Sequence, residues 1–271
     1  MSELAKNKAT ICIVNYKTVD FTKLCLRSIR KFTRHPYEVI VVDNNSQDES
    51  LEYLKSLKWI RLLQRDTSSD IRGGYSHGAA LQLGIEHCNT EFFVSMHSDT
   101  FIQKNNWLTE LISYFNNDEG IACVGSGKIE LTPQWRIWLK KATDFRTFKR
   151  KLLREPDPYG KYRYYNRTIC CLYRTAVLNN ENLTFLPDSD KELTAGKRLY
   201  FELVDRGYKT VELPAKVLGQ YVIHLAHATQ AINPAEFTLR KKTVKKYSLR
   251  VKKVFSSGII RQILNDNSID K

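Results

Sequence analysis

The sequence lacks the features that mark several large classes of protein. No apolar run approaches the roughly 18–20 residues that span a bilayer, and the first eight residues, MSELAKNK, lack the apolar stretch of a secretory signal. None of the six cysteines belongs to a CxxC pair, so neither a zinc site nor a disulfide framework is indicated. The contents of hydrophobic residues, 42%, and charged residues, 27%, are those of a folded chain. We therefore expect a soluble, cytoplasmic protein.

Positive charge is the one strong bias in the composition. The formal net charge is +14, and residues 136–154 and 240–253 carry eight Lys or Arg each, whereas the first hundred residues mix both signs. A field of this size attracts nucleotides, nucleic acids or anionic lipids. The 271 residues contain no repeat and no low-complexity linker, so we expect one compact unit.

The apolar pattern predicts strands alternating with helices. Strands are expected at 9–16, 37–46, 59–63 and 91–96, and helices at 19–32, 48–57 and 74–88. A further strand is expected at 121–127, a strand followed by the start of a helix at 168–178, and a helix at 196–207 ending at Gly207. This order predicts an α/β fold with a doubly wound, mostly parallel sheet and a ligand crevice at the carboxyl ends of its strands.

Polar residues follow the predicted strands and are expected to share that crevice. They are Asn15, Tyr16, residues 43–46, His97, Ser98 and Asp99. Asp43 can accept the ring N–H of a uracil or thymine, or it can begin a turn and cap the next helix. Asp99 can bind a hard divalent cation that bridges two phosphates, or it can cap the following segment.

A glycine pair opens the third predicted helix in the sequence RGGYSHGAALQLG. Gly73 and Gly74 can form a simple turn, or they can leave helical N–H groups free for a pyrophosphate, with Arg72 as counter-charge. Other phosphate motifs fit poorly. Ala79 and Ala80 stand where a phosphate-binding loop needs Lys and Ser or Thr, and GxGxxG is missing.

Four motifs in order, ICIVNYK, VIVVDNNSQD, RGGYSHGAALQLG and FFVSMHSDT, resemble the donor-binding half of inverting family-2 glycosyltransferases with the GT-A fold. The resemblance covers residues 10 to about 130. It implies that Asp43 reads the base, assisted by Asn15, Tyr16 and Asn45. It further implies that Arg72, Gly73 and Gly74 approach the diphosphate, and that residues 97–99 form a strand-end DXD motif for Mg²⁺ or Mn²⁺.

One position departs from that motif, because His97 replaces its first carboxylate. Asp99 then remains as the metal ligand of the motif, and His97 and Ser98 contact the donor or a water. In YVIHLAHAT, a stretch similar to the late histidine strand of the family, His224 is the expected second ligand and His227 the next candidate. A hydrogen-bonded core histidine is the alternative for each. A degenerate protein that only binds the sugar nucleotide also remains open.

The inverting reaction requires a carboxylate that takes the proton of the acceptor hydroxyl. The resemblance places this base in LPDSDKELTAGKRLYFELVDRGY, where Asp190 is the first candidate, Glu192 the second and Asp188 the third. No Glu-Asp pair is present there, and a solvated loop or helix cap is the alternative for each acid.

Two basic segments suggest partners. Trp135, Trp138, Phe145 and Phe148 lie among basic residues, which suits either a lid over a lipid-linked or polyanionic glycan or a structural helical insertion. Residues 244–255 carry an apolar helical stripe flanked by lysines, which suits docking on the domain itself or on an anionic membrane.

The sequence as a whole predicts a metal-assisted inverting glycosyltransferase. We expect a donor-binding portion at 1–130, an acceptor-binding and catalytic portion of the same domain at 131–235, and a basic amphipathic helical tail at 236–271. The expected donor is a UDP- or dTDP-sugar, and the acceptor a glycan, lipid-linked or polysaccharide hydroxyl, met at the inner face of a membrane. The alternatives are a nucleotidyltransferase and a basic nucleic-acid-binding protein, although no nucleic-acid partner is expected without a recognised binding module.

Overall fold

The computed structural model describes residues 4–68, 70, 73–116, 118–127, 139, 142–143, 165–188, 193–237 and 240–271. The strands are β1 Ala5–Asn15, β2 Tyr37–Asp43, β3 Arg61–Gln64, β4 Thr90–His97, β5 Thr100–Ile102, β6 Ile121–Gly125, β7 Cys170–Arg174, β8 Lys209–Glu212 and β9 Val222–His224. The helices are α1 Val19–Phe32, α2 Glu49–Ser56, α3 Gly73–Glu86, α4 Trp107–Ser113, α7 Thr175–Asn180, α8 Ala195–Asp205, α9 Ala215–Leu218, α10 Ala228–Ile232, α11 Lys241–Phe255, α12 Gly258–Asn265 and the 3-10 helix η2 Asn267–Asp270. The aromatic segment with Trp135, Trp138, Phe145 and Phe148, and the expected boundary at residue 130, lie outside the described residues.

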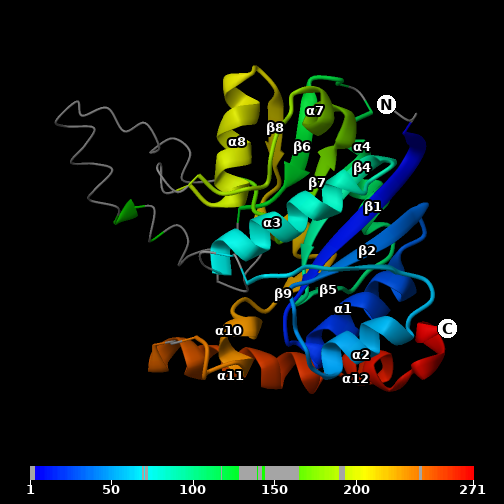
Figure 1. Ribbon diagram of the computed structural model, residues 1–271, viewed down its shortest axis with the longest axis vertical. Coiled ribbons are helices and arrows are strands. Elements are labelled where there is room, and N and C mark those ends of the chain that lie inside the picture. The colour runs from blue at the N-terminus through cyan, green and yellow to red at the C-terminus, as the bar shows by residue number, and fades with distance from the viewer. Residues whose placement is uncertain are drawn as a thin grey trace.

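A seven-stranded sheet in the order β3-β2-β1-β4-β7-β6-β8 forms the centre of the molecule (Figure 1). β1 runs parallel to β2 and β4, and β3 runs parallel to β2, as the alternation of strands and helices predicts. β7 runs antiparallel to both of its neighbours, β4 and β6. The expected mostly parallel, doubly wound sheet is therefore confirmed.

Side chains of the central strands point alternately to two hydrophobic cores. Ile11 and Ile13 of β1 belong to the core that contains α1, α4 and α12, whereas Cys12 and Val14 belong to the core that contains α3, α7 and α8. Figure 1 shows α3 crossing the face of the sheet turned to the viewer. Because both faces are covered, these strands read as near-continuous apolar runs in the sequence.

Gly207 ends α8 as the sequence predicts, whereas the cap of α2 is Asp48 and not Asp43. Gly207 has φ +84 and follows α8, and its N–H donates to the carbonyl of Val204 at 3.0 Å while that of Tyr208 donates to Leu203. Glycine adopts this left-handed conformation without steric cost. Asp48 caps α2 by accepting the N–H of Ser50.

All six cysteines are free thiols buried inside the protein, so no disulfide framework exists. Burial raises the pKa of Cys170 to about 12 and also raises the pKa of Cys12 and Cys25. Such thiols remain protonated near neutral pH and behave as small hydrophobic groups.

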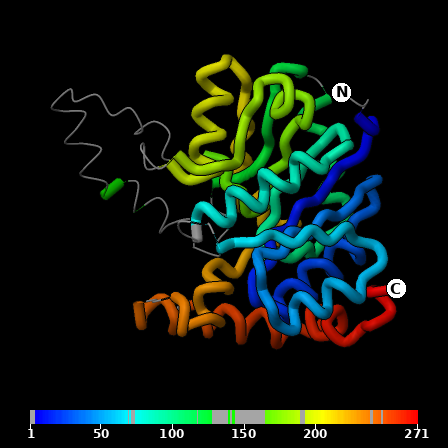
Figure 2. Tube along the Cα trace, viewed as in Figure 1, coloured from blue at the N-terminus to red at the C-terminus, as the bar shows by residue number. Residues whose placement is uncertain are grey.

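The C-terminal helices α11 and α12 run along one edge of the molecule (Figure 2). On the apolar stripe of α11, Tyr247 and Val254 are buried and Val251 and Phe255 are partly buried against the core, whereas Val244 is 40% exposed. The helix therefore docks on its own domain. Its lysines at 241, 242, 245, 252 and 253 are exposed. Among the described residues, no helix is long and apolar enough to cross a membrane.

Arg27 of α1 holds the end of the chain. Its side chain is only 1% exposed, and it donates to the carbonyls of Ile263 and Leu264 at the end of α12 and to Asn267 and Asp270 beyond it. The guanidinium thus satisfies helix C-terminal carbonyls that have no partner within the helix.

Candidate functional site

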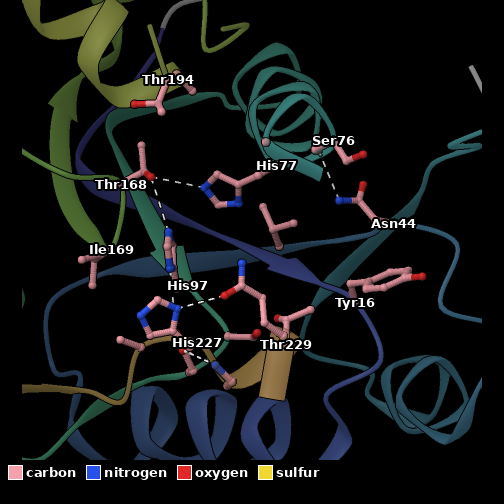
Figure 3. A pocket seen from close by; sticks show the side chains of 18 of the residues that line it. Tyr16, Asn44, Ser76, His77, His97, Thr168, Ile169, Thr194, His227 and Thr229 are labelled. Carbon is pink, nitrogen blue, oxygen red and sulfur yellow. Dashed lines mark hydrogen bonds and ion pairs between the residues drawn. The ribbon is translucent and has the colours of Figure 1, made fainter. Parts of the chain in front are cut away.

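A cleft of about 920 Å³ lies at the carboxyl ends of the central strands (Figure 3). Its lining comes from the ends of β1, β2 and β4, the start of α3, the segment before β7, the start of α8 and the segment after β9. The lining includes Tyr16, Asn44, Asp70, Gly74, Ser76, His77, His97, Ser98, Asp99, Arg167, Thr168, Thr194, His224, His227, Glu236 and Phe237. This is the place where a doubly wound sheet offers a crevice to ligands.

Several residues singled out in the sequence converge on this cleft. Tyr16 follows β1, Gly74 lies in the first turn of α3, His97 ends β4 and Ser98 and Asp99 follow it, and His224 and His227 come from the end of β9 and the turn after it. Elements far apart in the sequence thus present their polar groups to one volume.

Other predicted donor-binding residues do not line the cleft. Asp43 is fully buried, and its carboxylate accepts from the side-chain amide of Asn15 at 2.6 Å and from the backbone N–H of Ser46 at 3.0 Å. Asn45 is exposed and accepts a hydrogen bond from Gln47. Asp43 and Asn15 therefore join the ends of β1 and β2 beneath the cleft. Arg72 lies outside the described residues.

Asn44, the residue directly after Asp43, lines the cleft in its place. Its side-chain carbonyl accepts from Arg65 at 2.7 Å, and its amide donates to the backbone carbonyl of Ser76 at 3.2 Å. Arg65 also pairs with Asp70 at 3.0 Å. Since arginine can only donate and a carbonyl can only accept, these contacts fix the orientation of the Asn44 amide. The sequence signal for this residue was its position at the end of β2.

An aromatic wall closes the cleft near Tyr16. The Tyr16 hydroxyl donates to Glu236, the ammonium of Lys17 lies 2.6 Å from the same carboxylate, and the ring of Phe237 meets that of Tyr16 edge to face at 6.5 Å. The contact with Lys17 lowers the pKa of Glu236. Sequence reasoning missed Glu236 and Phe237, because they come from a loop far along the chain.

Positive charge reaches the cleft from α3 and from Arg167. Gly74, Ser76 and His77 of the first turns of α3 line the cleft, so the positive end of the helix dipole faces it. Arg167 also lines the cleft, with its guanidinium 5.9 Å from the ring centre of Tyr165. No motif in the sequence marked Arg167.

Side-chain atoms of His97, Asp99 and His224 lie within 4.8 Å of one another. The geometry follows from the small second sheet, in which β5 pairs antiparallel with β9 and Thr100 stands opposite His224. Nε2 of His224 lies 3.3 Å and Nδ1 of His97 3.8 Å from Oδ1 of Asp99. The backbone N–H of Ala228 donates to the other oxygen, Oδ2, at 3.3 Å.

The donor atoms of this group fit a divalent cation. Oδ1 of Asp99 and both ring nitrogens of His224 are buried and have no hydrogen-bond partner of good geometry among the described residues. Buried polar atoms usually have partners, and unpartnered ones call for an explanation such as an ion. One carboxylate oxygen and two imidazole nitrogens are ligands that divalent transition ions accept.

The protonation states suit cation binding. Burial favours protonation of Asp99, but the neighbouring imidazoles and the N–H of Ala228 outweigh it and hold the pKa of that carboxyl below its usual value. Burial lowers the pKa of His97 to about 3 and that of His77 to about 4. Near neutral pH the Asp99 carboxylate is therefore ionised, and the rings of His97 and His77 are uncharged with one nitrogen each that carries no proton.

The two leading candidates for the catalytic base, Asp190 and Glu192, lie outside the described residues. Asp188 and Leu193, which flank them, exchange backbone hydrogen bonds at 3.0 and 2.9 Å. The next three residues, 194–196, line the cleft. The chain therefore reaches the cleft directly after this acidic segment.

Comparison with known proteins identifies related sequences and folds. The profile of Glycosyl transferase family 2 matches residues 10–172. A teichoic acid poly(glycerol phosphate) polymerase of Staphylococcus epidermidis is 26% identical over 120 residues, which cover 42% of this chain and 16% of that protein.

Two solved structures share the fold over most of the chain. TarS of S. aureus, residues 1–349, superposes with a TM-score of 0.53 and 14% identity, covering 96% of this chain and 75% of that one. The mannosyltransferase PcManGT of Pyrobaculum calidifontis, solved with GDP-Man and Mn²⁺, superposes with a TM-score of 0.52 and 12% identity, covering 96% and 79%. These likenesses concern the fold, and they confirm the GT-A architecture expected from the sequence.

Proposed function

Because the chain belongs to Glycosyl transferase family 2, we propose that it moves a sugar from a UDP- or dTDP-sugar to an acceptor hydroxyl, with inversion at the anomeric carbon. One observation carries the proposal. Tyr16, the start of α3 and the His97, Asp99 and His224 group all face the same cleft. These three parts of the cleft suit a nucleotide base, a diphosphate and a cation, respectively.

The base is proposed to bind between Tyr16 and the end of β2. The Tyr16 ring offers an apolar face, and the Asn44 amide, held by Arg65 and Ser76, offers hydrogen bonds at the edge of the cleft. Asp43, which the sequence suggested for this contact, is proposed to act from beneath by holding the strand end. The residue proposed to recognise the base is therefore still at the end of β2, but it is Asn44 instead of Asp43.

The diphosphate is proposed to lie against the N-terminus of α3 and Arg167. The free N–H groups of the first turn and the guanidinium both favour negative charge. His97, Asp99 and His224 would hold the cation, and we expect Mn²⁺ in preference to Mg²⁺ because two of the three ligands are imidazoles. When bound, such a cation supplies charge neutralisation for a departing nucleoside diphosphate.

Asp190 remains the proposed catalytic base, with Glu192 as the second candidate. The role requires a carboxylate within reach of the acceptor hydroxyl when this oxygen attacks the anomeric carbon. Support comes from the sequence position of these acids, directly before the residues at 194–196 that line the cleft.

An anionic, membrane-associated acceptor is the proposed partner. The similarity to a teichoic acid poly(glycerol phosphate) polymerase and the net charge of +14 both support a glycan or lipid-linked acceptor with negative charge. The exposed lysines of α11, together with Leu249 at 62% exposure, are proposed to contact the inner face of an anionic membrane. Failure to bind anionic vesicles at low salt would count against this contact.

The donor can be identified by measuring thermal stabilisation with a panel of nucleotide sugars, with and without Mn²⁺. The preferred donor should then release its nucleoside diphosphate when an acceptor is present, and NMR of the product should show the inverted anomer. Release of pyrophosphate would instead identify a nucleotidyltransferase. Salt-sensitive binding to RNA or DNA with no response to any nucleotide sugar would favour a nucleic-acid-binding protein.

The variant Asp190→Asn tests the base separately. It should bind the donor as the unsubstituted chain does and lose nearly all transfer, since the amide cannot accept the proton. Full turnover by this variant would remove Asp190 from the catalytic role.

A further inference from the structure

Thr168 stands between two histidines of the cleft (Figure 3). Its hydroxyl oxygen lies 3.2 Å from Nε2 of His77 and 3.5 Å from Nε2 of His97. Thr168 is 8% exposed and precedes β7, whereas His77 belongs to α3 and His97 to the end of β4. Three separate elements therefore meet at one hydroxyl group.

The orientation of Thr168 is held by close packing at Gly196. A Cβ atom at residue 196 would lie 3.2 Å from the Thr168 methyl group, so only glycine lets the start of α8 pack here without displacement. With its methyl group against α8, the threonine presents its hydroxyl to the two imidazoles. The hydroxyl position is thus set by the fold.

Hydrogen-bond chemistry then determines which ring nitrogen of His97 is free. Nδ1 is the His97 nitrogen that faces Oδ1 of Asp99, and a nitrogen that binds a metal carries no proton. With Nδ1 bound to a cation, the N–H of the neutral ring would be on Nε2, where it would donate to Thr168. The single hydroxyl proton of Thr168 would then be donated to Nε2 of His77.

We propose that Thr168 and His77 are positioning residues that hold His97 with Nδ1 directed toward Asp99 and His224. The inference rests on the cation site of the proposed function and explains how a histidine replaces the first carboxylate of the motif. A carboxylate has equivalent oxygens, but an imidazole must present the correct nitrogen. A hydrogen bond to the opposite nitrogen is the usual means of achieving this.

Mn²⁺ affinity of the full chain, measured by electron paramagnetic resonance, tests the proposal. Thr168→Val keeps the side-chain shape but removes the hydroxyl, and should weaken Mn²⁺ binding about 10- to 100-fold. Thr168→Ser restores the hydroxyl and should bind within about threefold of the unsubstituted chain. Thr194→Val, the same substitution elsewhere on the cleft wall, should leave Mn²⁺ affinity unchanged.

A nitrogen-15 NMR spectrum of the histidine rings in the metal-free protein supplies a second readout. His97 should carry its proton on Nε2 in the unsubstituted chain, and Thr168→Val should populate both tautomers. A proton on Nδ1 in the unsubstituted chain would overturn the proposal, even if Thr168→Val fails to fold.

Other outcomes separate this inference from the function beneath it. Equal Mn²⁺ affinities for Thr168→Val and the unsubstituted chain would overturn the inference alone. A loss in His77→Phe as large as that in His224→Ala would make His77 a direct ligand and would also overturn it. Absence of Mn²⁺ binding by the unsubstituted chain would overturn the cation site and this inference together, while donor binding could still support the glycosyltransferase.

Discussion

His224 approaches Asp99 to 3.3 Å because β9 pairs with β5, which only Ser98 and Asp99 separate from the end of β4. The antiparallel register places His224 opposite Thr100, one residue beyond Asp99. A backbone ladder of three residue pairs therefore brings a late histidine to the predicted metal motif. The second sheet is small, but it completes the candidate cation site.

Substitution of the two buried members of this group should abolish cation binding. Asp99→Asn replaces the charged carboxylate by a neutral amide and His224→Ala removes a ligand atom, and we expect Mn²⁺ affinity to fall at least about 100-fold in each, which is near 3 kcal/mol. Isothermal titration with Mn²⁺ measures the loss. His227→Ala provides the control, since His227 lines the cleft outside the three-residue group. A larger loss in the control would exchange the roles of the two histidines.

The histidine in the motif should set the choice of metal. With two imidazoles among three ligands, the unsubstituted chain should bind Mn²⁺ at least about tenfold more tightly than Mg²⁺. His97→Asp supplies a second hard oxygen ligand and should narrow that difference. Competition between the two ions, followed by the Mn²⁺ resonance signal, measures it. An unchanged ratio in His97→Asp would show that His97 does not contact the ion.

Substitution of Asp43 should mainly reduce stability, whereas substitution of its neighbour Asn44 should mainly weaken nucleotide-sugar binding. Asp43→Ala removes the acceptor of the buried Ser46 N–H and one of the three acceptors of the Asn15 amide, and should destabilise the fold by about 2–4 kcal/mol in urea unfolding. Asn44→Ala removes a group on the cleft and should weaken nucleotide-sugar binding about 5- to 30-fold with a smaller effect on stability. If Asp43→Ala weakened nucleotide-sugar binding and Asn44→Ala mainly reduced stability, Asp43 would be the residue that recognises the base.

Removal of Asp270 should destabilise the docking of the C-terminal helices. Asp270→Ala takes the carboxylate from Arg27, whose side chain is 1% exposed, and we expect a loss of about 3 kcal/mol. Glu52→Ala breaks the exposed pair with Lys55 and serves as the control, with an expected loss under about 1 kcal/mol. Urea unfolding of both variants makes the comparison. Equal losses would mean that Arg27 is satisfied by the α12 carbonyls alone.

Stability of the metal-free protein should fall in acid because His77 resists protonation in the folded state. Its pKa is lowered to about 4, while an unfolded histidine has a pKa near 6.5, so the unfolded chain binds more protons between these values. Above about pH 6.5, the contribution of His77 to the free energy of unfolding should be constant. Between about pH 6.5 and pH 4, that free energy should fall as the pH is lowered. His77→Gln should reduce that decrease by about 1–2 kcal/mol after allowance for partial exposure.

Thermal unfolding between pH 4 and 7, with a chelator present, measures this slope. The two proteins should differ by several degrees at the acidic end and converge near neutral pH. Parallel curves would show that protonation of His77 costs the folded state nothing.

Periodicity in the sequence predicted most of the fold because the central elements obey simple spacing rules. Helix α1 occupies the predicted residues 19–32, and Gly207 ends α8 as expected. The site was predictable where polar residues end a buried strand, as at His97 and Asp99. Base recognition was harder, because neighbouring residues at a strand end face different directions, so Asp43 is buried and Asn44 lines the cleft.

Other parts of the site depend on contacts that no local pattern contains. Arg167 and Thr168 reach the cleft because β7 enters the sheet antiparallel between β4 and β6. Glu236 and Phe237 reach Tyr16 from the opposite end of the sequence. His224 was anticipated only by family resemblance, since three residue pairs of a short ladder leave a weak sequence pattern.

The buried state of every cysteine offers a practical means of observing this protein at work. Thiol-reactive dyes attack the ionised sulfur, and the native sulfurs are enclosed and hold their protons. A cysteine introduced in place of exposed Leu249 would therefore be labelled selectively without removal of the six natural ones. Fluorescence from that single position would report directly whether α11 meets a lipid surface.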